Sequence, residues 1–378
     1  MDDVAVTFWL GSYTPGADGS EPGAGVGVRA LVREDSGALV PVAHHEADSP
    51  SWVVQHPDLP VVYAAEEFSG FVVPFRAAPD GTLTPLGERV HLGGIVCHLT
   101  VAPRGDLLVA SCYGDGRVVV LPLTPDGRLT GRTLVAAQAT DPYGAPDAAT
   151  LARGGLLLPA GMSGDDEDGS TDEPERRSRA HTSRWLPDGR VVTTDLGFDL
   201  VRFWRRGPSP AAPLLLDHEV TLPRGVGPRH VAWHESGHLH VVTEYSIEVF
   251  TLRAGRDGRF SVVAGVEATS DGAQDGDAAA ELTVVGSREH LHASVRGSNR
   301  ISTLQIRGDG SELRPVADID SGGDWPRHHA EDGVVVHVAN QRSGTVDSFA
   351  IDERTGAPSR RVGRVDVGGP TCLTPARV

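Results

Sequence analysis

The chain consists of short stretches in which apolar and polar residues alternate, each interrupted by glycine, proline or aspartate. Alternation at a period of two is typical of β-strands, and helical periodicity is almost absent. A unit of strand, tight turn and second strand reads "PSWVVQHPDLPVVYAAEE" at 50–67 and "VCHLTVAPRGDLLVASCY" at 96–113, and further copies begin at residues 179, 228, 279 and 326. The repeat predicts an all-β protein.

A seventh copy of this unit is divided between the two ends of the chain. The segment "PTCLTPARV" at 370–378 supplies its first strand, and "VTFWLGSYT" at 6–14 supplies its second. A β-propeller closes its ring in this way, because the last strand joins the blade that the N-terminus begins. We therefore expect residues 1–378 to form a single seven-bladed propeller domain.

The interval between the second and third copies is much longer than the others, which indicates an insertion around 138–180. It contains "GMSGDDEDGSTDEPERRSR" at 161–179, an acidic stretch rich in glycine and serine. Such a composition cannot bury much apolar surface, so we expect a mobile loop.

The composition excludes several classes of function. The chain has 39% hydrophobic and 22% charged residues and a formal net charge of -17. This charge repels phosphate backbones and anionic membranes, so we expect no nucleic-acid partner. All basic residues other than histidine are arginine. The absence of lysine excludes Schiff-base and pyridoxal-phosphate chemistry and the phosphate-binding P-loop lysine.

The sequence also bears on location and redox state. It opens with "MDDVAVTFWLGSYTPG", which lacks the basic region of a secretory signal, and it contains no apolar run of about 18 residues. We therefore expect a cytoplasmic protein without a membrane span, either a monomer or a weak homodimer. The three cysteines, Cys97, Cys112 and Cys372, are far apart, which favours reduced and buried thiols.

The motif "HESGH" at His234–His238 matches the H-E-x-x-H pattern of zinc proteases. That chemistry requires both histidines on one face of a helix. Here the motif occupies the turn position of the strand repeat, aligned with "LPDG" at 186–189. We interpret it as a turn and expect no metal site.

Polar residues concentrate at two positions of the repeat that open on the same rim of a propeller. The first strand of a blade lines the central channel, so its start and the end of the second strand lie at one mouth. The strand-one starts are Trp52, His98, His181, His230, Glu281, His328 and Cys372, with Arg229 and Arg327 one position earlier. The strand-two ends are Glu66, Tyr113, Asp195, Glu244, Arg296, Asn340 and Ser12.

This convergence predicts a site for a small, anionic, oxygen-rich ligand. A structural explanation is also open, because propeller channels contain water and their walls are often polar for that reason. Arg229 with Glu244, or Arg296 with Glu281, could then be structural ion pairs.

Several short motifs resemble the seven-bladed propeller lactonases, which include bacterial 6-phosphogluconolactonases and fungal 3-carboxy-cis,cis-muconate lactonising enzymes. They follow the family's order over nearly the whole chain: "GSYTPG" (11–16), "VCH" (96–98), "DLGFDLV" (195–201), "GVGPRH" (225–230), "AAEL" (279–282), "VRGSNRIS" (295–302), "GGDWPRH" (322–328) and "VANQRSGTVDSFAIDERTG" (338–356). The chain departs from the family at the pocket. The usual P-H-x-H is "SRAH" (178–181), Asn-Arg-Gly is "VRG" (295–297) and Ala-Asn-Tyr is "SCY" (111–113).

The resemblance implies a catalytic set of one histidine, two arginines and one glutamate, which maps onto His181, Arg229, Glu244 and Arg296. It implies hydrolysis of a sugar lactone, with 6-phosphogluconolactone the leading candidate and no metal or organic cofactor. His181 or Glu244 would be the general base, and the arginines would bind the anion. Further substrate-binding candidates are His98, His230, Glu281, Arg327, His328, Asn340, Asp195, Glu66 and Arg179.

Two alternatives remain open at this point. A muconate-type cyclase would use the same four residues to add a carboxylate across a double bond. A propeller without catalysis would act as a ligand sensor or an interaction scaffold.

Overall fold

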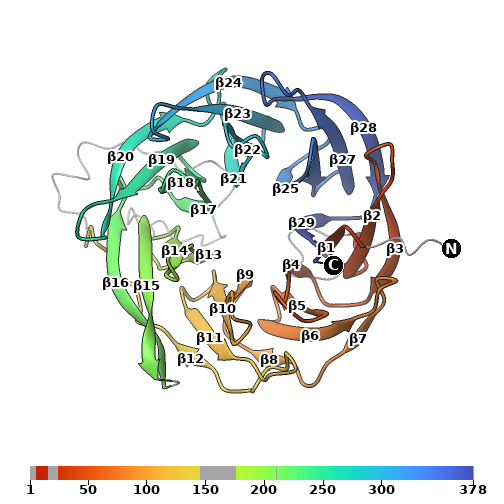
Figure 1. The fold of residues 1–378 in the computed structure, drawn as a ribbon, viewed down its shortest axis with the longest axis vertical. Helices are drawn as coiled ribbons and strands as arrows, with labels where there is room; N and C mark the ends of the chain where they lie inside the picture. Colours follow the sequence, from red (N-terminus) through yellow and green to blue (C-terminus); the bar gives the residue numbers. More distant parts are fainter. Residues whose placement is uncertain (1–5, 16–23, 145–175, 210, 378) are drawn as a thin grey trace, which may run out of the picture.

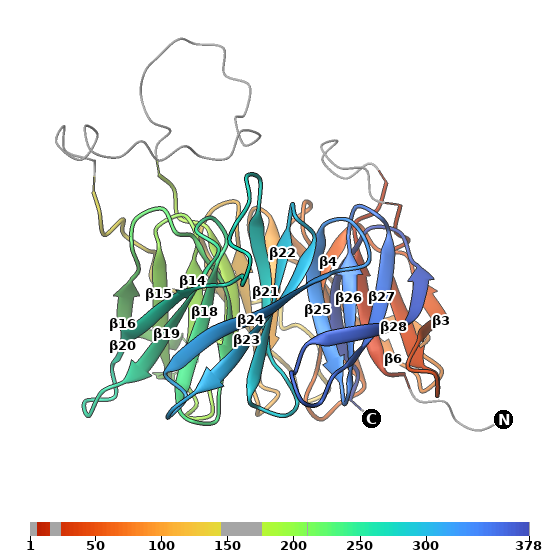
Figure 2. The same cartoon turned by 90° about the horizontal axis from the view of Figure 1, so that it is seen from above.

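Seven β-sheets are arranged in a ring around a central axis in the computed structural model of the protein (Figure 1). The structure describes residues 6–15, 24–144, 176–209 and 211–377, so most of the predicted acidic insertion lies outside the described residues. Six sheets have four strands and one has five. The described ranges contain no helix, and hence none that could cross a membrane. Figure 2 shows the ring edge-on.

The strands follow the repeat in chain order. The blade that closes the ring contains β29 (Pro370–Pro375), β1 (Phe8–Ser12), β2 (Val28–Arg33) and β3 (Leu39–His45). The next two contain β4 (Pro50–Gln55), β5 (Val61–Glu66), β6 (Phe71–Ala77), β7 (Leu83–Pro85) and β8 (Val90–His91), then β9 (Val96–Val101), β10 (Leu107–Cys112), β11 (Val118–Pro122) and β12 (Leu134–Val135).

The remaining four blades have four strands each. They are β13 (Ala180–Trp185), β14 (Val191–Asp195), β15 (Leu200–Ser209) and β16 (Ala212–Thr221); β17 (Pro228–Trp233), β18 (His238–Thr243), β19 (Glu248–Ala254) and β20 (Phe260–Glu267); β21 (Ala278–Val284), β22 (His290–Arg296), β23 (Arg300–Arg307) and β24 (Glu312–Asp320); and β25 (Pro326–Asp332), β26 (Val335–Asn340), β27 (Thr345–Ile351) and β28 (Pro358–Asp366).

The ring closes as the divided seventh repeat predicts. Strand β29 pairs antiparallel with β1, with Trp9 opposite Thr374 and Leu10 opposite Leu373. The seven-bladed all-β fold and its closure are therefore confirmed. The core lies between the blades, where apolar faces of neighbouring sheets pack together. Phe8 and Leu10, for example, belong to the same buried cluster as Val346 of the preceding blade.

Deleting residues 370–378 is expected to destabilise the whole ring, because the deletion leaves β1 as an unpaired apolar edge. Lost burial of side chains such as Leu373, which is 1% exposed, should lower the melting temperature by about 10 °C or more. Thermal unfolding followed by circular dichroism measures the change. A synthetic peptide of residues 370–378 should restore part of it, and a truncated chain that melts at the wild-type temperature would contradict the prediction.

The "HESGH" motif forms the turn between β17 and β18, as predicted. The His234 backbone N–H donates to the His238 carbonyl oxygen at 2.9 Å, which closes a tight hairpin turn. Both imidazoles contact the Ser236 hydroxyl, at 2.6 Å from His234 and 2.9 Å from His238. Within the described ranges no three His, Cys, Asp or Glu residues are arranged to hold a metal ion. The three cysteines are buried and free.

Candidate active site at the mouth of the central channel

A β-bulge marks the start of the innermost strand in every blade. The register between strands one and two shifts at the same place in all seven sheets. In β17, for instance, Pro228 lies opposite Thr243 and His230 opposite Val242, so Arg229 is the extra residue. A bulge turns neighbouring side chains away from strict alternation, which allows both Arg229 and His230 to face the channel.

Nine residues from six blades enclose a cavity of about 10 Å³ at this level, just large enough for one water molecule. Six of them occupy bulge positions of this kind, and the other three are two histidines and a tryptophan. The nine are Ser51, Trp52, Cys97, His181, Arg229, His230, Arg327, His328 and Thr371.

Glu244 joins two arginines from adjacent blades above this cavity. Its Oε2 lies 2.8 Å from Arg229 Nε and 3.0 Å from Arg296 Nη2. The Arg229 contact is close but lacks hydrogen-bond geometry, so Nε and Nη1 of Arg229 have no hydrogen-bond partner among the described residues. Burial alone would raise the pKa of the Glu244 carboxyl, but Arg296 and Arg229 outweigh it and lower this pKa. Glu244 is therefore ionised at neutral pH and a weak base.

His181 lies beside this cluster and, in contrast to the ionised Glu244, is uncharged. Burial, followed by the charge of Arg229, holds the pKa of its imidazole well below the usual value, so the ring is neutral at pH 7. Its Nδ1 is buried without a hydrogen-bond partner among the described residues. Burial and then the nearby Arg296 lower the pKa of Arg229 to about 10, which still leaves it charged. A neutral base thus adjoins a buried cation.

A second charged cluster lies across the channel, and of its members the sequence predicted only Arg327. Arg327 Nη2 is 3.7 Å from Glu67 Oε2, and the Tyr13 hydroxyl donates to Glu67 Oε1 at 3.0 Å. The buried hydroxyls of Ser51 and Thr371 have no hydrogen-bond partner in the described part of the chain. This wall of the channel therefore presents polar groups that a ligand could bind.

A carboxylate with two histidines lies deeper in the channel. Glu281 Oε2 is 2.9 Å from His230 Nδ1 and 3.0 Å from His328 Nε2. Burial by itself raises the Glu281 pKa, but the two histidines outweigh it and lower the pKa well below its usual value. Burial lowers the pKa of His230 to about 4. His98 stacks on Trp52 with ring centroids 4.0 Å apart.

The comparisons with known proteins identify the family. The sequence profile of the lactonase family with a seven-bladed β-propeller matches residues 7–375. The chain belongs to this family. It is 24% identical to a 6-phosphogluconolactonase of Bacillus subtilis over 97% of both chains, and 28% identical to one of Pectobacterium atrosepticum over 78% of this chain and 92% of that one.

A solved structure supports the fold of this lactonase-family protein. The periplasmic gluconolactonase of Pseudomonas aeruginosa superposes with a TM-score of 0.81 over 99% of both chains, at 23% sequence identity. The likeness extends over the whole ring.

The structure corrects the placement of Glu66, Asp195 and Asn340, which were expected to bind substrate. Each lies opposite the residue just before a bulge, and each is engaged within its own blade. Glu66 pairs with Arg89 at 3.1 Å, and Asp195 accepts hydrogen bonds from the backbone N–H groups of Arg179 and Phe198 at 2.8 and 3.0 Å.

The Asn340 side chain is likewise bound by other groups of the protein. Its amide donates to the Ser321 carbonyl at 3.0 Å and to Asp347 at 3.1 Å. The residue one position further, such as Glu67 after Glu66, reaches the mouth instead. Successive side chains on a strand point to opposite faces, so an error of one residue reverses the assignment. The predicted alignment of His181 is also shifted by one residue. His181 directly follows Ala180, so it corresponds in register to Arg229 and not to His230.

The other predicted residues lie at the mouth or in the channel. Arg179 covers the Tyr113 ring, with its guanidinium carbon 4.7 Å from the ring centroid. The expected alternative pair of Arg296 with Glu281 is not formed, because Arg296 binds Glu244 and Glu281 binds the two histidines.

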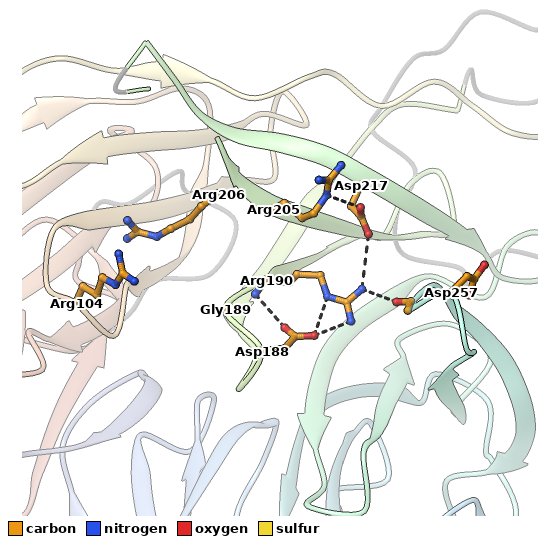
Figure 3. A pocket seen from close by; sticks show the side chains of 9 residues that line it. Arg104, Asp188, Gly189, Arg190, Arg205, Arg206, Asp217 and Asp257 are labelled. Atoms are coloured by element: carbon orange, nitrogen blue, oxygen red, sulfur yellow. Dashed lines mark hydrogen bonds and ion pairs between the residues drawn. The ribbon is translucent and has the colours of Figure 1, made fainter. Parts of the chain in front are cut away.

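A larger pocket of about 530 Å³ lies near the opposite rim (Figure 3). Its charged lining residues come from strand ends and turns, and most are already paired. Arg190 contacts Asp188 at 2.6 Å and Asp217 at 3.6 Å, and Arg206 pairs with Asp106. Because these charges neutralise one another at an exposed surface, the channel mouth is the stronger candidate for the active site.

Proposed function

We propose that the protein hydrolyses a sugar-derived lactone that carries an anionic group, with 6-phosphogluconolactone as the leading substrate. The observation that carries this proposal is that His181 and Arg229 line one cavity: the imidazole is neutral, and its Nδ1 and the Nη1 of Arg229 have no hydrogen-bond partner among the described residues. Ester hydrolysis needs both functions, a base for water and a cation for the developing oxyanion.

Water, His181 and Arg229 are sufficient for the proposed hydrolysis. His181 accepts a proton as the oxygen of water attacks the lactone carbonyl carbon, and the carbonyl electrons form an oxyanion that Arg229 stabilises. The tetrahedral intermediate collapses, the ring C–O bond breaks, and His181 returns the proton to the leaving oxygen. The product is the open hydroxy acid. Glu244 holds Arg229 and Arg296 in place and remains ionised throughout.

The names of the relatives support the reaction class. The similar curated proteins of Bacillus subtilis and Pectobacterium atrosepticum are 6-phosphogluconolactonases. The family membership of this chain favours an enzyme over a sensor or a scaffold.

A muconate-type cyclase is the second candidate, and the opposite wall of the channel disfavours it. Ser51 and Thr371 line the cavity, and their hydroxyls and Oε2 of Glu67 have no hydrogen-bond partner among the described residues. A polyhydroxylated ligand can donate to the Glu67 carboxylate, whereas a dicarboxylate would be repelled by it. Hydrolysis assays with 6-phosphogluconolactone, gluconolactone and a muconate panel test the choice. Turnover of the muconates alone would overturn the proposal.

Replacing Arg296 with lysine is expected to raise KM for a phosphorylated lactone by about tenfold, because lysine keeps the charge but loses the planar fork. Replacing Glu244 with glutamine should reduce kcat/KM by a similar factor and also lower the melting temperature, since it leaves two buried arginines without their counter-charge. Steady-state kinetics and thermal melts measure both. Unchanged kinetics in both variants would mean that the ion pairs are purely structural.

A further inference from the structure

Trp325 has an unusual backbone for a bulky residue. It directly precedes β25 and has a φ of +65°, in the left-handed region. The same position before the first strand is also left-handed in four other blades, at Ser49, Ile95, Gly227 and Gly369. Glycine adopts this conformation without steric cost, whereas a large side chain is strained there. The fold itself therefore does not require tryptophan at this position.

The Trp325 side chain contacts two arginines. The guanidinium carbon of Arg296 is 5.3 Å from the ring centroid, and that of Arg342 is 3.4 Å away. Two hydrogen bonds fix the backbone: its N–H donates to Asn299 Oδ1 at 2.8 Å, and its carbonyl accepts from the Gln341 N–H at 3.0 Å. The strained residue is thus held with its ring against Arg296.

The indole ring of Trp325 holds Arg296 without occupying the hydrogen-bond donors of the guanidinium group. Nε and Nη2 of Arg296 donate to the Ala278 and Ala279 carbonyls at 3.2 and 3.1 Å, and Nη2 also contacts Glu244. Among the described residues no hydrogen bond involves Nη1. An aromatic face attracts the guanidinium through its quadrupole, whereas another carboxylate would occupy the remaining N–H groups and cancel the charge.

We propose that Trp325 is a positioning residue that presents the free edge of Arg296 to the anionic group of the ligand. This inference rests on the proposed function, in which Arg296 binds that anion. The strain at Trp325 is retained because the indole orders the guanidinium before the ligand arrives, which reduces the entropy lost on binding.

Trp325→Asn and Trp325→Phe test this role, with Ile95→Asn as the matched control. Asparagine tolerates the left-handed region, so Trp325→Asn removes the ring without adding strain. Ile95→Asn places asparagine at the equivalent left-handed position of another blade. We expect Trp325→Asn to weaken binding of inorganic phosphate and of 6-phosphogluconate by about tenfold, from the loss of the cation–π contact. KM should rise in parallel, with kcat changed by less than about threefold.

Trp325→Phe should restore most of the affinity, because it retains an aromatic face, and Ile95→Asn should bind as the wild type does. Calorimetry gives the dissociation constants, and thermal melts show that each variant is folded. Wild-type affinity in Trp325→Asn, equal losses in Trp325→Asn and Ile95→Asn, or equal losses in Trp325→Asn and Trp325→Phe would each overturn the inference.

The binding measurements separate this inference from the proposed function. If the wild type binds phosphate but hydrolyses no lactone, and Trp325→Asn still weakens phosphate binding, the role of Trp325 stands and the lactonase proposal fails. If the wild type hydrolyses the lactone and Trp325→Asn matches it in KM and phosphate affinity, the proposed function stands and the role of Trp325 fails. A wild type that binds neither probe overturns the role of Trp325, and one that in addition hydrolyses no lactone overturns both.

Discussion

Replacing His181 with asparagine is expected to reduce kcat on the best lactone substrate by about a hundredfold or more, the usual scale for loss of a general base. The melting temperature should change little, because the Nδ1 of His181 has no hydrogen-bond partner among the described residues to lose. Steady-state kinetics on freshly prepared lactone, corrected for spontaneous hydrolysis, measure the effect. A variant with full turnover would exclude His181 as the base.

The pH dependence of the wild type provides an independent check on His181. The base must be neutral to act, and burial holds its pKa well below the usual value of about 6.5. We therefore expect kcat/KM to stay level as the pH falls to 6.5 and to decline only at lower pH. The His181→Asn variant should lack this decline. An acid limb centred above pH 6.5 would indicate a different base.

Acid should unfold the protein through its buried histidines. Burial lowers the pKa values of His240, His329 and His337 to about 3. In the unfolded chain these groups take up protons near pH 6.5. Their contribution to stability is therefore complete above pH 6.5 and is lost progressively as the pH falls towards 3. Three such groups lower the free energy of unfolding by up to about 4 kcal/mol per pH unit in this window.

This loss is large relative to the total stability of a typical domain, about 5–15 kcal/mol. We expect half of the molecules to be unfolded at roughly pH 4–5. Urea titrations between pH 7 and pH 5 measure the slope. His337→Gln should reduce this slope, since one of the buried histidines no longer titrates, whereas His44→Asn at an exposed position should leave it unchanged. A free energy of unfolding that is constant over this range would contradict the prediction.

The arginine–carboxylate cluster shows where the sequence pattern was sufficient. Glu244 and Arg296 were placed at the ends of second strands in adjacent blades, and their side chains meet at 3.0 Å. This succeeded because Glu244 directly follows β18 and Arg296 is the last residue of β22, so both lie where the second strand reaches the mouth. The same counting failed for Glu66, Asp195 and Asn340, because each lies one residue short of the position that reaches the channel mouth.

The second wall of the site could not be found in the same way. Glu67 is adjacent to the predicted Glu66, and only the register of β5 against β4 shows which of the two reaches the channel. Tyr13 meets Glu67 across more than fifty residues of chain, at a contact between two neighbouring blades. Trp325 was visible only as part of a motif, since its φ and its contact with Arg296 depend on the folded chain.

The sequence by itself determined the number of blades, the closure of the ring and the rim at which polar residues gather. These follow from local alternation and from the repeat, and both can be recognised in the sequence without knowledge of the tertiary contacts. Tertiary structure decided which polar residues face one another and which of them are charged. A bulge of one residue selects the face of the strand, and burial beside particular neighbours makes His181 neutral and keeps Glu244 ionised.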